Sequence, residues 1–119
     1  MTAQTPKAAR AELAARVTAA ALPGVNVVLD HEPTAVVHGV AVTFSTAGID
    51  PTEWLISARV YVSTAMGAEA AQDALDDTVL AVDPLLYEVP RTRWEFDGPD
   101  EDLEAYVATM VLSYPREDF

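Results

Sequence analysis

The sequence predicts an α+β fold in which two helices pack on one face of a mostly antiparallel, mixed sheet of about five strands, in the order α-β-β-β-α-β-β. Two segments have apolar residues at helical spacing, and the other apolar segments alternate with a period of two. The helices separate runs of strands instead of alternating with single strands, which argues against a parallel α/β sheet. With 119 residues, half of them hydrophobic, the chain has the size of a single domain over residues 1–119.

The first helix is predicted over residues 6–22, and the first strand over residues 25–33. Thr5 and Pro6 match an N-cap and a first helical residue, and apolar residues then recur at helical spacing until "LPG" interrupts them. The run "VNVVLDHEP" is strand-like. Pro33 ends it, because proline lacks the backbone donor that a strand needs.

Two longer strands and the second helix are predicted for the middle of the chain. Side chains alternate in "AVVHGVAVTFSTAG" and in "WLISARVYVS", and "GIDPTEW" supplies turn residues between them. We expect the second of these strands to be central. The period becomes helical in "GAEAAQDALDDTVLAVDPLL", and we expect this helix to end before Pro84. Its early acidic residues suit the positive helix N-terminus, whereas Asp83 lies at the unfavourable end.

The last two strands, "RTRWEF" and "AYVATMVLSY", are predicted to form an antiparallel hairpin. Five of the eight residues between them are acidic: Asp97, Asp100, Glu101, Asp102 and Glu104. This connection could be a metal or catalytic site, a solvated tip that discourages edge pairing, or an electrostatic surface. A two-metal hydrolase needs carboxylates from separate elements, and the spacing is not that of a calcium-binding loop, so no metal site is predicted.

Charge and composition exclude several classes of function. The formal net charge is -12 and the sequence pI is about 4.2, so we expect no affinity for nucleic acid or for an anionic membrane. The chain has no cysteine, hence no disulfide and no thiolate chemistry. No stretch approaches the roughly 18–20 apolar residues of a membrane span, and the start lacks the apolar run of a signal peptide, so we expect a soluble protein.

No catalytic constellation is visible in the sequence. His31 and His38 lie near Asp30 and Glu32, but adjacent strand residues point to opposite faces and cannot all converge on a ligand. No serine has a nucleophile-elbow context, and no glycine-rich phosphate loop is present. We therefore predict that the protein is not an enzyme and needs no cofactor. The alternative enzyme class is one with a divalent metal held by carboxylates.

Uneven charge points to contacts between copies of the chain. Residues 1–16 carry three basic residues against Glu12, a local charge of +2, while the remainder carries four basic and eighteen acidic residues. Unlike surfaces of this kind favour head-to-tail association. The candidate inter-subunit contacts are the basic residues and one tryptophan at the start of a strand: Lys7, Arg10, Arg16, Arg59, Arg91, Arg93 and Trp54.

The whole arrangement resembles the tail-terminator, or tail-completion, proteins of long-tailed phages. The resemblance is carried by the first helix ending in "ALPGVNVVLDHEP", the strands "HGVAVTFSTAG" and "EWLISARVYVS", the acidic helix "AEAAQDALDDTVLAV" and the hairpin "RTRWEFDGPDEDLEAYVATMVLSY". These segments cover nearly the whole chain. Related neck and head-closure proteins have a similar size and are a neighbouring interpretation.

The resemblance implies a structural virion protein. Family members form a hexameric ring that caps the tail tube, ends its polymerisation and contacts the head-completion proteins. Expected partners are therefore further copies of the chain, the major tail-tube protein and the head-completion or neck proteins, while DNA passes through without specific binding. The expected location is the head-proximal end of the virion tail, after assembly in the host cytoplasm.

Within such a ring, the acidic hairpin has two candidate positions. It could line the lumen, where carboxylates would repel passing DNA, or it could face the tail tube, where they would steer docking. An alternative function is that of an acidic DNA mimic that inhibits a nucleic-acid-binding protein, or of another small binding module. A mimic needs a continuous acidic stripe, whereas the sequence divides its acidic residues among the second helix, the hairpin and the C-terminus.

Overall fold

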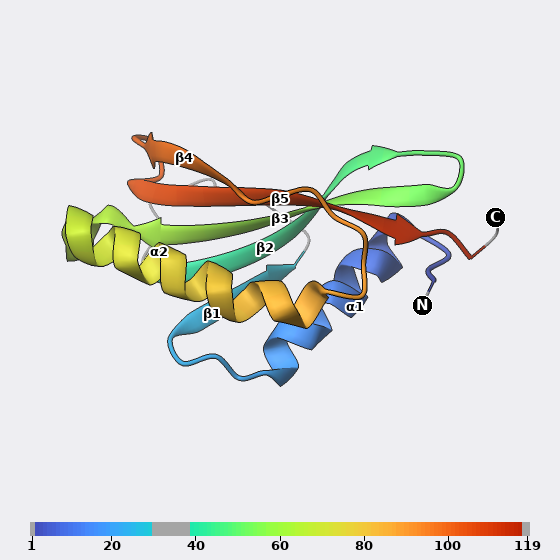
Figure 1. Cartoon of the computed structure of the whole chain (residues 1–119), viewed down its shortest axis with the longest axis horizontal. Helices are drawn as coiled ribbons and strands as arrows, with labels where there is room; N and C mark the ends of the chain where they lie inside the picture. Colours follow the sequence, from blue (N-terminus) through green and yellow to red (C-terminus); the bar gives the residue numbers. More distant parts are fainter. Residues whose placement is uncertain (1, 30–38, 118–119) are drawn as a thin grey trace.

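A computed structural model of the chain describes residues 2–29 and 39–117 (Figure 1). The predicted fold class is confirmed, because two helices and five strands occur in the expected order. The elements are α1 (Pro6–Ala19), β1 (Val25–Leu29), β2 (Val40–Ile49), β3 (Glu53–Ser63), the short 3-10 helix η1 (Thr64–Met66), α2 (Ala68–Val82), a second 3-10 helix η2 (Asp83–Leu86), β4 (Glu95–Asp100) and β5 (Ala105–Pro115).

The strands form one mixed sheet in the order β1-β2-β3-β5-β4. β1 pairs with β2 in parallel, and the other three pairings are antiparallel. β3 is the middle strand: each of its eleven residues pairs with β5, and Trp54 to Val62 also pair with β2. The strand predicted to be central therefore is central, and β1 and β4 are the two edges.

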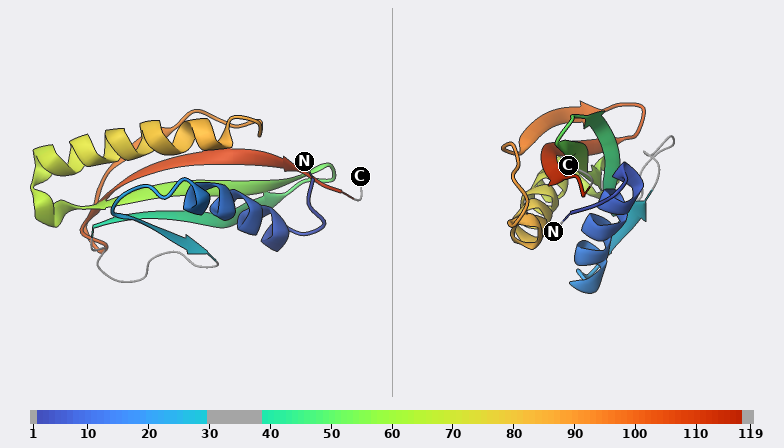
Figure 2. Two further views of the ribbon diagram at one scale, coloured as in Figure 1. Left: turned by 90° about the horizontal axis from the view of Figure 1, so that it is seen from below. Right: turned by 90° about the vertical axis from the view of Figure 1, so that its right-hand side faces the viewer.

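Both helices pack on the same face of the sheet, as the right-hand view of Figure 2 shows. The alternation read from the sequence explains this, because Ile56, Ala58 and Val60, at every second position of β3, point toward the helices and are fully buried. Leu13 of α1 and Leu75 of α2 pack into the same core from the helix side. The main hydrophobic core is thus the layer between the sheet and the two helices.

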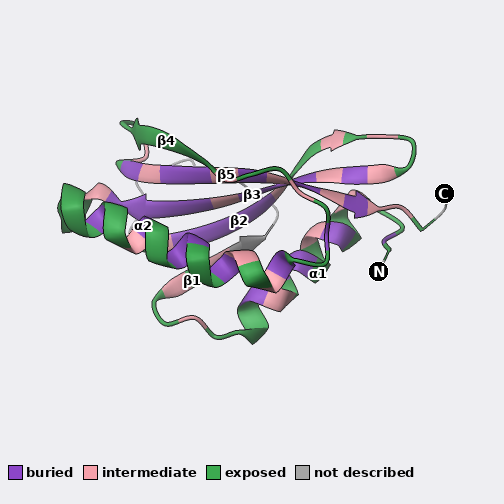
Figure 3. Ribbon diagram, in the orientation of Figure 1, coloured by how far each residue is buried: buried purple, intermediate pink, exposed green. Residues whose placement is uncertain are grey.

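The opposite face of the sheet carries a smaller apolar cluster formed by Ala41, Tyr61, Ala105 and Val107, with Leu103 packed against it. Thr43 and Ser57 are also buried on this face. β3 is consequently buried on both sides, whereas every residue of β4 is exposed (Figure 3). The acidic hairpin therefore begins on the most exposed strand of the sheet.

The first helix begins as predicted and ends earlier. The Thr5 hydroxyl accepts a hydrogen bond from the backbone N–H of Ala8 at 3.0 Å, which confirms the N-cap. The helix ends at Ala19, three residues before the predicted end at residue 22, because Ala21 adopts a left-handed backbone with φ of 51°. The strand predicted over residues 25–33 is observed from Val25 to Leu29, and its remainder lies outside the described residues.

The prediction that the first hairpin strand covers residues 91–96 is wrong at its start. Regular pairing begins only at Glu95, and Arg91 and Arg93 precede β4 in an irregular connector in which Arg91 makes an isolated bridge to Leu112. The reason is that Asp83 at the end of α2 accepts hydrogen bonds from Arg91 and Trp94, which draws the connector toward the helix. Arg91 and Arg93 therefore do not share the face of a strand.

The molecule is elongated, with extents of 46 × 26 × 22 Å. One end carries the β4–β5 turn, η1 and the start of α2, and the other carries both chain termini and the β2–β3 turn (Figure 1). At the latter end, Arg116 donates to the carbonyl oxygen of Asp50 at 3.1 Å, and the Ala3 N–H donates to the Pro115 carbonyl at 3.1 Å. The terminal segments are thus fastened to the β2–β3 hairpin.

Candidate functional site

The acidic hairpin is more ordered than a simple loop. Asp97 and Asp100 belong to β4, where they pair with Val107 and Ala105 around a bulge, and only residues 101–104 form the turn. The bulge contains Gly98 and Pro99, which interrupt regular pairing. Two of the five candidate carboxylates are therefore strand residues, and three belong to the turn.

Two hairpin acids hold the turn in place. The Asp100 carboxylate accepts hydrogen bonds from the backbone N–H groups of Asp102 at 3.0 Å and Leu103 at 3.1 Å. The Glu104 carbonyl accepts from the backbone N–H of Thr64 at 2.8 Å and from the Thr64 hydroxyl at 3.0 Å. Since Thr64 begins η1, these bonds fix the turn to the segment that precedes α2.

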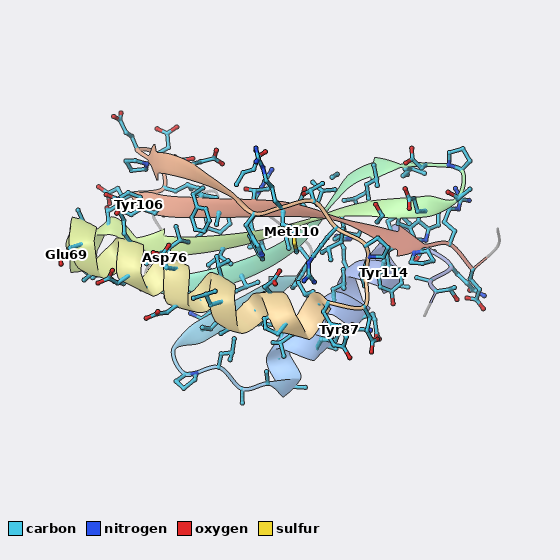
Figure 4. All side chains as sticks on the ribbon, in the orientation of Figure 1. Glu69, Asp76, Tyr87, Tyr106, Met110 and Tyr114 are labelled. Carbon is cyan, nitrogen blue, oxygen red and sulfur yellow. The ribbon has the colours of Figure 1, made fainter. Side chains whose placement is uncertain are left out.

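Folding brings acidic residues of α2 to the same end of the molecule. Glu69, Asp73 and Asp76 are three or four residues apart and therefore share one exposed helix face. Asp76 and Asp97 border the same groove, so the two acidic groups are neighbours. Figure 4 shows Glu69, Asp76 and Tyr106 at this end. We name it the acidic end, comprising Glu69, Asp73, Asp76, Asp97, Asp100, Glu101, Asp102 and Glu104.

The groove between α2 and β4 has a volume of about 380 Å³. Leu75, 3% exposed, and the half-buried Tyr106 lie at its base, while Phe96 is 54% exposed. The groove, which we name the α2–β4 groove, is lined by Gln72, Leu75, Asp76, Phe96, Asp97, Gly98, Pro99 and Tyr106. It combines apolar surface with carboxylates, an arrangement suited to a cationic partner.

A second recess, of about 410 Å³, lies on the face of the sheet away from the helices. Arg59 borders it together with Asp97 and Asp100, so the structure brings this arginine to carboxylates of its own hairpin. β4 thus separates two hollows, and Asp97 borders both. The remaining residues around the recess are Tyr61, Gly98, Pro99, Leu103, Val107 and Thr109.

Most of the other candidate inter-subunit contacts are engaged within the chain. The Arg16 guanidinium lies 3.4 Å from Glu12 and 3.5 Å from Glu88, and the Arg91 guanidinium lies 3.1 Å from Asp83. Lys7 and Arg93 are exposed and Arg10 is half-buried. The cationic surface is therefore smaller than the sequence indicates.

Trp54 belongs to the core. Its side chain is 6% exposed, its indole N–H donates to the Ala3 carbonyl at 2.9 Å, and the Arg116 guanidinium stacks 4.1 Å from the ring centre. These contacts hold the N-terminal and C-terminal segments together. Trp54 is therefore placed to fasten the termini and has little surface left for a neighbouring subunit.

A third hollow, of about 540 Å³, lies at the end that carries the termini and is bordered by Ala3, Ala8, Glu12, Tyr114 and Glu117, with Thr2 and Gln4. Tyr114 is 1% exposed, and burial, with the nearby Glu12 carboxylate, raises the pKa of its hydroxyl in spite of Arg16. Nothing in the sequence pointed to this hollow, because its residues come from both ends of the chain.

The histidine cluster considered from the sequence, His31 and His38 with Asp30 and Glu32, lies outside the described residues. Within residues 2–29 and 39–117, no three histidine or acidic side chains are arranged to hold a metal ion. No helix in the same ranges is long and apolar enough to cross a membrane.

Comparison with protein-family models and with curated proteins finds no match to this chain. The functional argument therefore depends on the fold and on the acidic end. The sequence pointed to the five hairpin acids but not to the α2–β4 groove. The pairing of Phe96 with Ala108 puts its side chain on the helix side of the sheet. The sequence pattern does not tell whether a helix covers that side chain.

Proposed function

We propose that this protein is a structural assembly protein of a phage virion that acts as a tail terminator. In this role six copies form a ring that caps the tail tube, ends its polymerisation and joins it to the head-completion proteins. The observation that carries the proposal is the fold itself, since the element order on which the resemblance depends occurs here with both helices on one face of a mixed sheet.

The unlike edges of the sheet support a ring. β1 offers an apolar edge, "VNVVL", in parallel pairing, while β4 offers an acidic edge, "EFDGPD". Contact between unlike surfaces of successive copies is heterologous, and heterologous contacts that close generate rings. The elongated shape with one acidic end gives every copy the same polarity in such a ring. A function in assembly thus fits the surfaces of the molecule.

The test is light-scattering mass and electron microscopy of the purified chain, alone and with tail-tube protein, over a range of salt concentrations. We expect a species of six times 12.8 kDa, about 77 kDa, with a central pore, or tubes of limited length that carry a ring at one end. A monomer under every condition, together with tubes that grow unchecked in its presence, would contradict the proposal.

An acidic DNA mimic is the second candidate, and one observation favours it. The carboxylates of α2 and of the hairpin, separate in the sequence, meet across the α2–β4 groove and make a more continuous acidic surface than the sequence indicated. A mimic would bind a DNA-binding protein as a monomer, and its affinity would fall steeply with salt. Ring formation without such binding favours the terminator.

A further inference from the structure

The α2–β4 groove exposes apolar surface that the fold itself leaves uncovered. Phe96 lies at the second position of the edge strand, points to the helix side of the sheet and remains 54% exposed. Beside it, Leu75 and Tyr106 form the base of the hollow. Other large apolar side chains of the described residues are also exposed, namely Ile49, Met66, Leu80 and Tyr87, but none of these lines the groove.

The charge around this apolar surface selects its occupant. Asp76 and Asp97 border the groove, and no basic side chain is among its described lining residues. The same helix face continues with Asp73 and Glu69. An anionic occupant such as DNA would be repelled, whereas a cationic one would be attracted. Apolar surface beside the acidic face of α2 therefore matches a segment that carries an apolar residue next to basic ones.

A second copy of the chain is a poor match. The chain has a net charge of -12, and Arg16 and Arg91 are paired within their own chain. Lys7 and Arg93 are exposed but lie on different elements, and Arg10, which follows Lys7 on α1, is half-buried and already interacts within the chain. In a ring, a neighbouring copy would contact the outer edge of β4, and it would bring no cluster of positive charge to the groove.

We propose that the α2–β4 groove binds a basic segment of another protein, with an apolar side chain packed on Phe96 and a lysine or arginine residue facing Asp76 on α2. The identification of this partner as a neighbouring tail or neck protein rests on the function proposed above. The preference of the groove for a basic and apolar segment does not depend on that function. Binding occurs through side chains and not by strand addition, because the Gly98–Pro99 bulge breaks the edge of β4 and proline lacks a backbone donor.

This binding predicts the surroundings of one side of the hairpin. An exposed aromatic side chain such as Phe96 is typical of a protein–protein interface. It would contribute nothing to a surface along which DNA slides. The groove side of the hairpin therefore faces a protein partner in the assembly.

The experiment uses the isotope-labelled full-length chain and a synthetic peptide of Lys-Lys-Leu repeats, with a Lys-Lys-Ser peptide of equal charge and a Glu-Glu-Leu peptide as controls. We expect chemical-shift changes at Gln72, Asp76, Phe96 and Tyr106, an affinity that falls with salt, and weaker binding of both control peptides. Shift changes centred elsewhere, or equal binding of the serine peptide, would overturn the proposal.

A matched pair of variants sharpens the test. Phe96→Ser should weaken binding of the leucine peptide by about tenfold, since roughly half of a phenylalanine surface loses its contact. Leu80→Ser removes an even more exposed apolar side chain from α2 outside the groove and should leave the affinity unchanged. Both residues are exposed, so both variants should keep the melting temperature and the dispersed spectrum of the parent. Equal weakening by the two variants would contradict a site at Phe96.

The same samples separate this proposal from the proposed function. Peptide binding at the groove by a chain that never forms rings would contradict the terminator and leave the groove assignment standing. Rings that form normally while the peptide fails to bind would overturn the groove assignment alone. If Phe96→Ser prevents ring formation while the peptide does not bind, the occupant is a second copy and the proposal of a basic partner is wrong.

Discussion

At single residues, two non-glycine positions within residues 2–29 and 39–117 adopt a left-handed backbone, Ala21 with φ of 51° and Glu104 with φ of 48°. Such a conformation costs a residue with a β-carbon roughly 1 kcal/mol. At Glu104 the carbonyl bonds to Thr64 offset the cost. At Ala21 the backbone N–H bonds to the Thr18 carbonyl at 3.1 Å, which ends α1.

Ala21→Gly should therefore stabilise the protein by about 0.5–1 kcal/mol, because glycine adopts this backbone without steric cost. The control is Ala15→Gly on the exposed face of α1, which should destabilise by about 1 kcal/mol. Denaturant unfolding of the three proteins measures both changes. Destabilisation by both substitutions would show that Ala21 is not strained.

The titration of Tyr114 gives a prediction at alkaline pH. Its pKa is raised in the folded state by burial and by Glu12, so the folded protein binds its proton more tightly than the unfolded chain does. Stability is unaffected below the unfolded value of about 10 and falls as the pH rises above it. Tyr114→Phe should lose less stability than the parent between pH 10 and 11, measured by denaturant unfolding, and an identical loss would contradict the shift.

Residue-scale features were predictable where they depend on neighbours in sequence. The Thr5 N-cap follows from the "TPKA" order and is confirmed. The left-handed Ala21 was not predictable, because the usual signal is a glycine at that position and the glycine of "LPG" comes three residues later. The role of Asp83 was hidden as well, since its partners are eight and eleven residues away on an irregular connector.

At the scale of elements, Asp83 explains how α2 is joined to β4. Its carboxylate accepts from the Arg91 guanidinium at 3.1 Å and from the Trp94 indole at 2.9 Å, and its carbonyl accepts from Arg91 at 3.2 Å. A negative charge at a helix C-terminus is unfavourable, so these bonds account for an acid at this position. They also start β4 four residues later than the alternation predicts.

Asp83→Ala should destabilise the protein by about 1–2 kcal/mol, because the charged hydrogen bonds outweigh the relief at the helix end. Asp77→Ala, an exposed acid on the same helix, is the control and should change stability by less than about 0.5 kcal/mol. Thermal or denaturant unfolding measures the difference. Equal effects of the two substitutions would show that the connector does not depend on Asp83.

The elements themselves were largely predictable, because period and turn residues identify both helices and all five strands. What the periodicity could not supply is the order of the strands, which places β5 between β3 and β4 and leaves β4 at the edge. That order depends on contacts far apart in the sequence. It also decides the exposure of Phe96 and the neighbourhood of α2 and the hairpin, so the α2–β4 groove could not be found before the fold was known.

At the scale of the whole molecule, charge is distributed along the long axis. The acidic end carries eight carboxylates, while the opposite end carries fewer, among them Asp50, Glu53 and Glu117, together with Arg116, which donates to the Asp50 carbonyl. The molecule is thus polar although its net charge is strongly negative. A ring of such molecules would present the acidic ends together, on the lumen or on one rim, and the position decides what the hairpin does.

The turn acids Glu101 and Asp102 distinguish these positions, because no described hydrogen bond of the fold uses their carboxylates, unlike that of Asp100. Glu101→Gln with Asp102→Asn should therefore change stability by less than about 0.5 kcal/mol. In particles that carry the double variant, a lumen position predicts normal tail attachment with slower DNA release, since less repulsion acts on the passing phosphates. A tube-facing position predicts fewer attached tails, with an effect that is largest at low salt and shrinks as salt screens the interaction. Counts of tailed particles and rates of DNA release distinguish the two positions. Variant particles that match the parent in both measurements would show that the turn acids only solvate the tip of the hairpin.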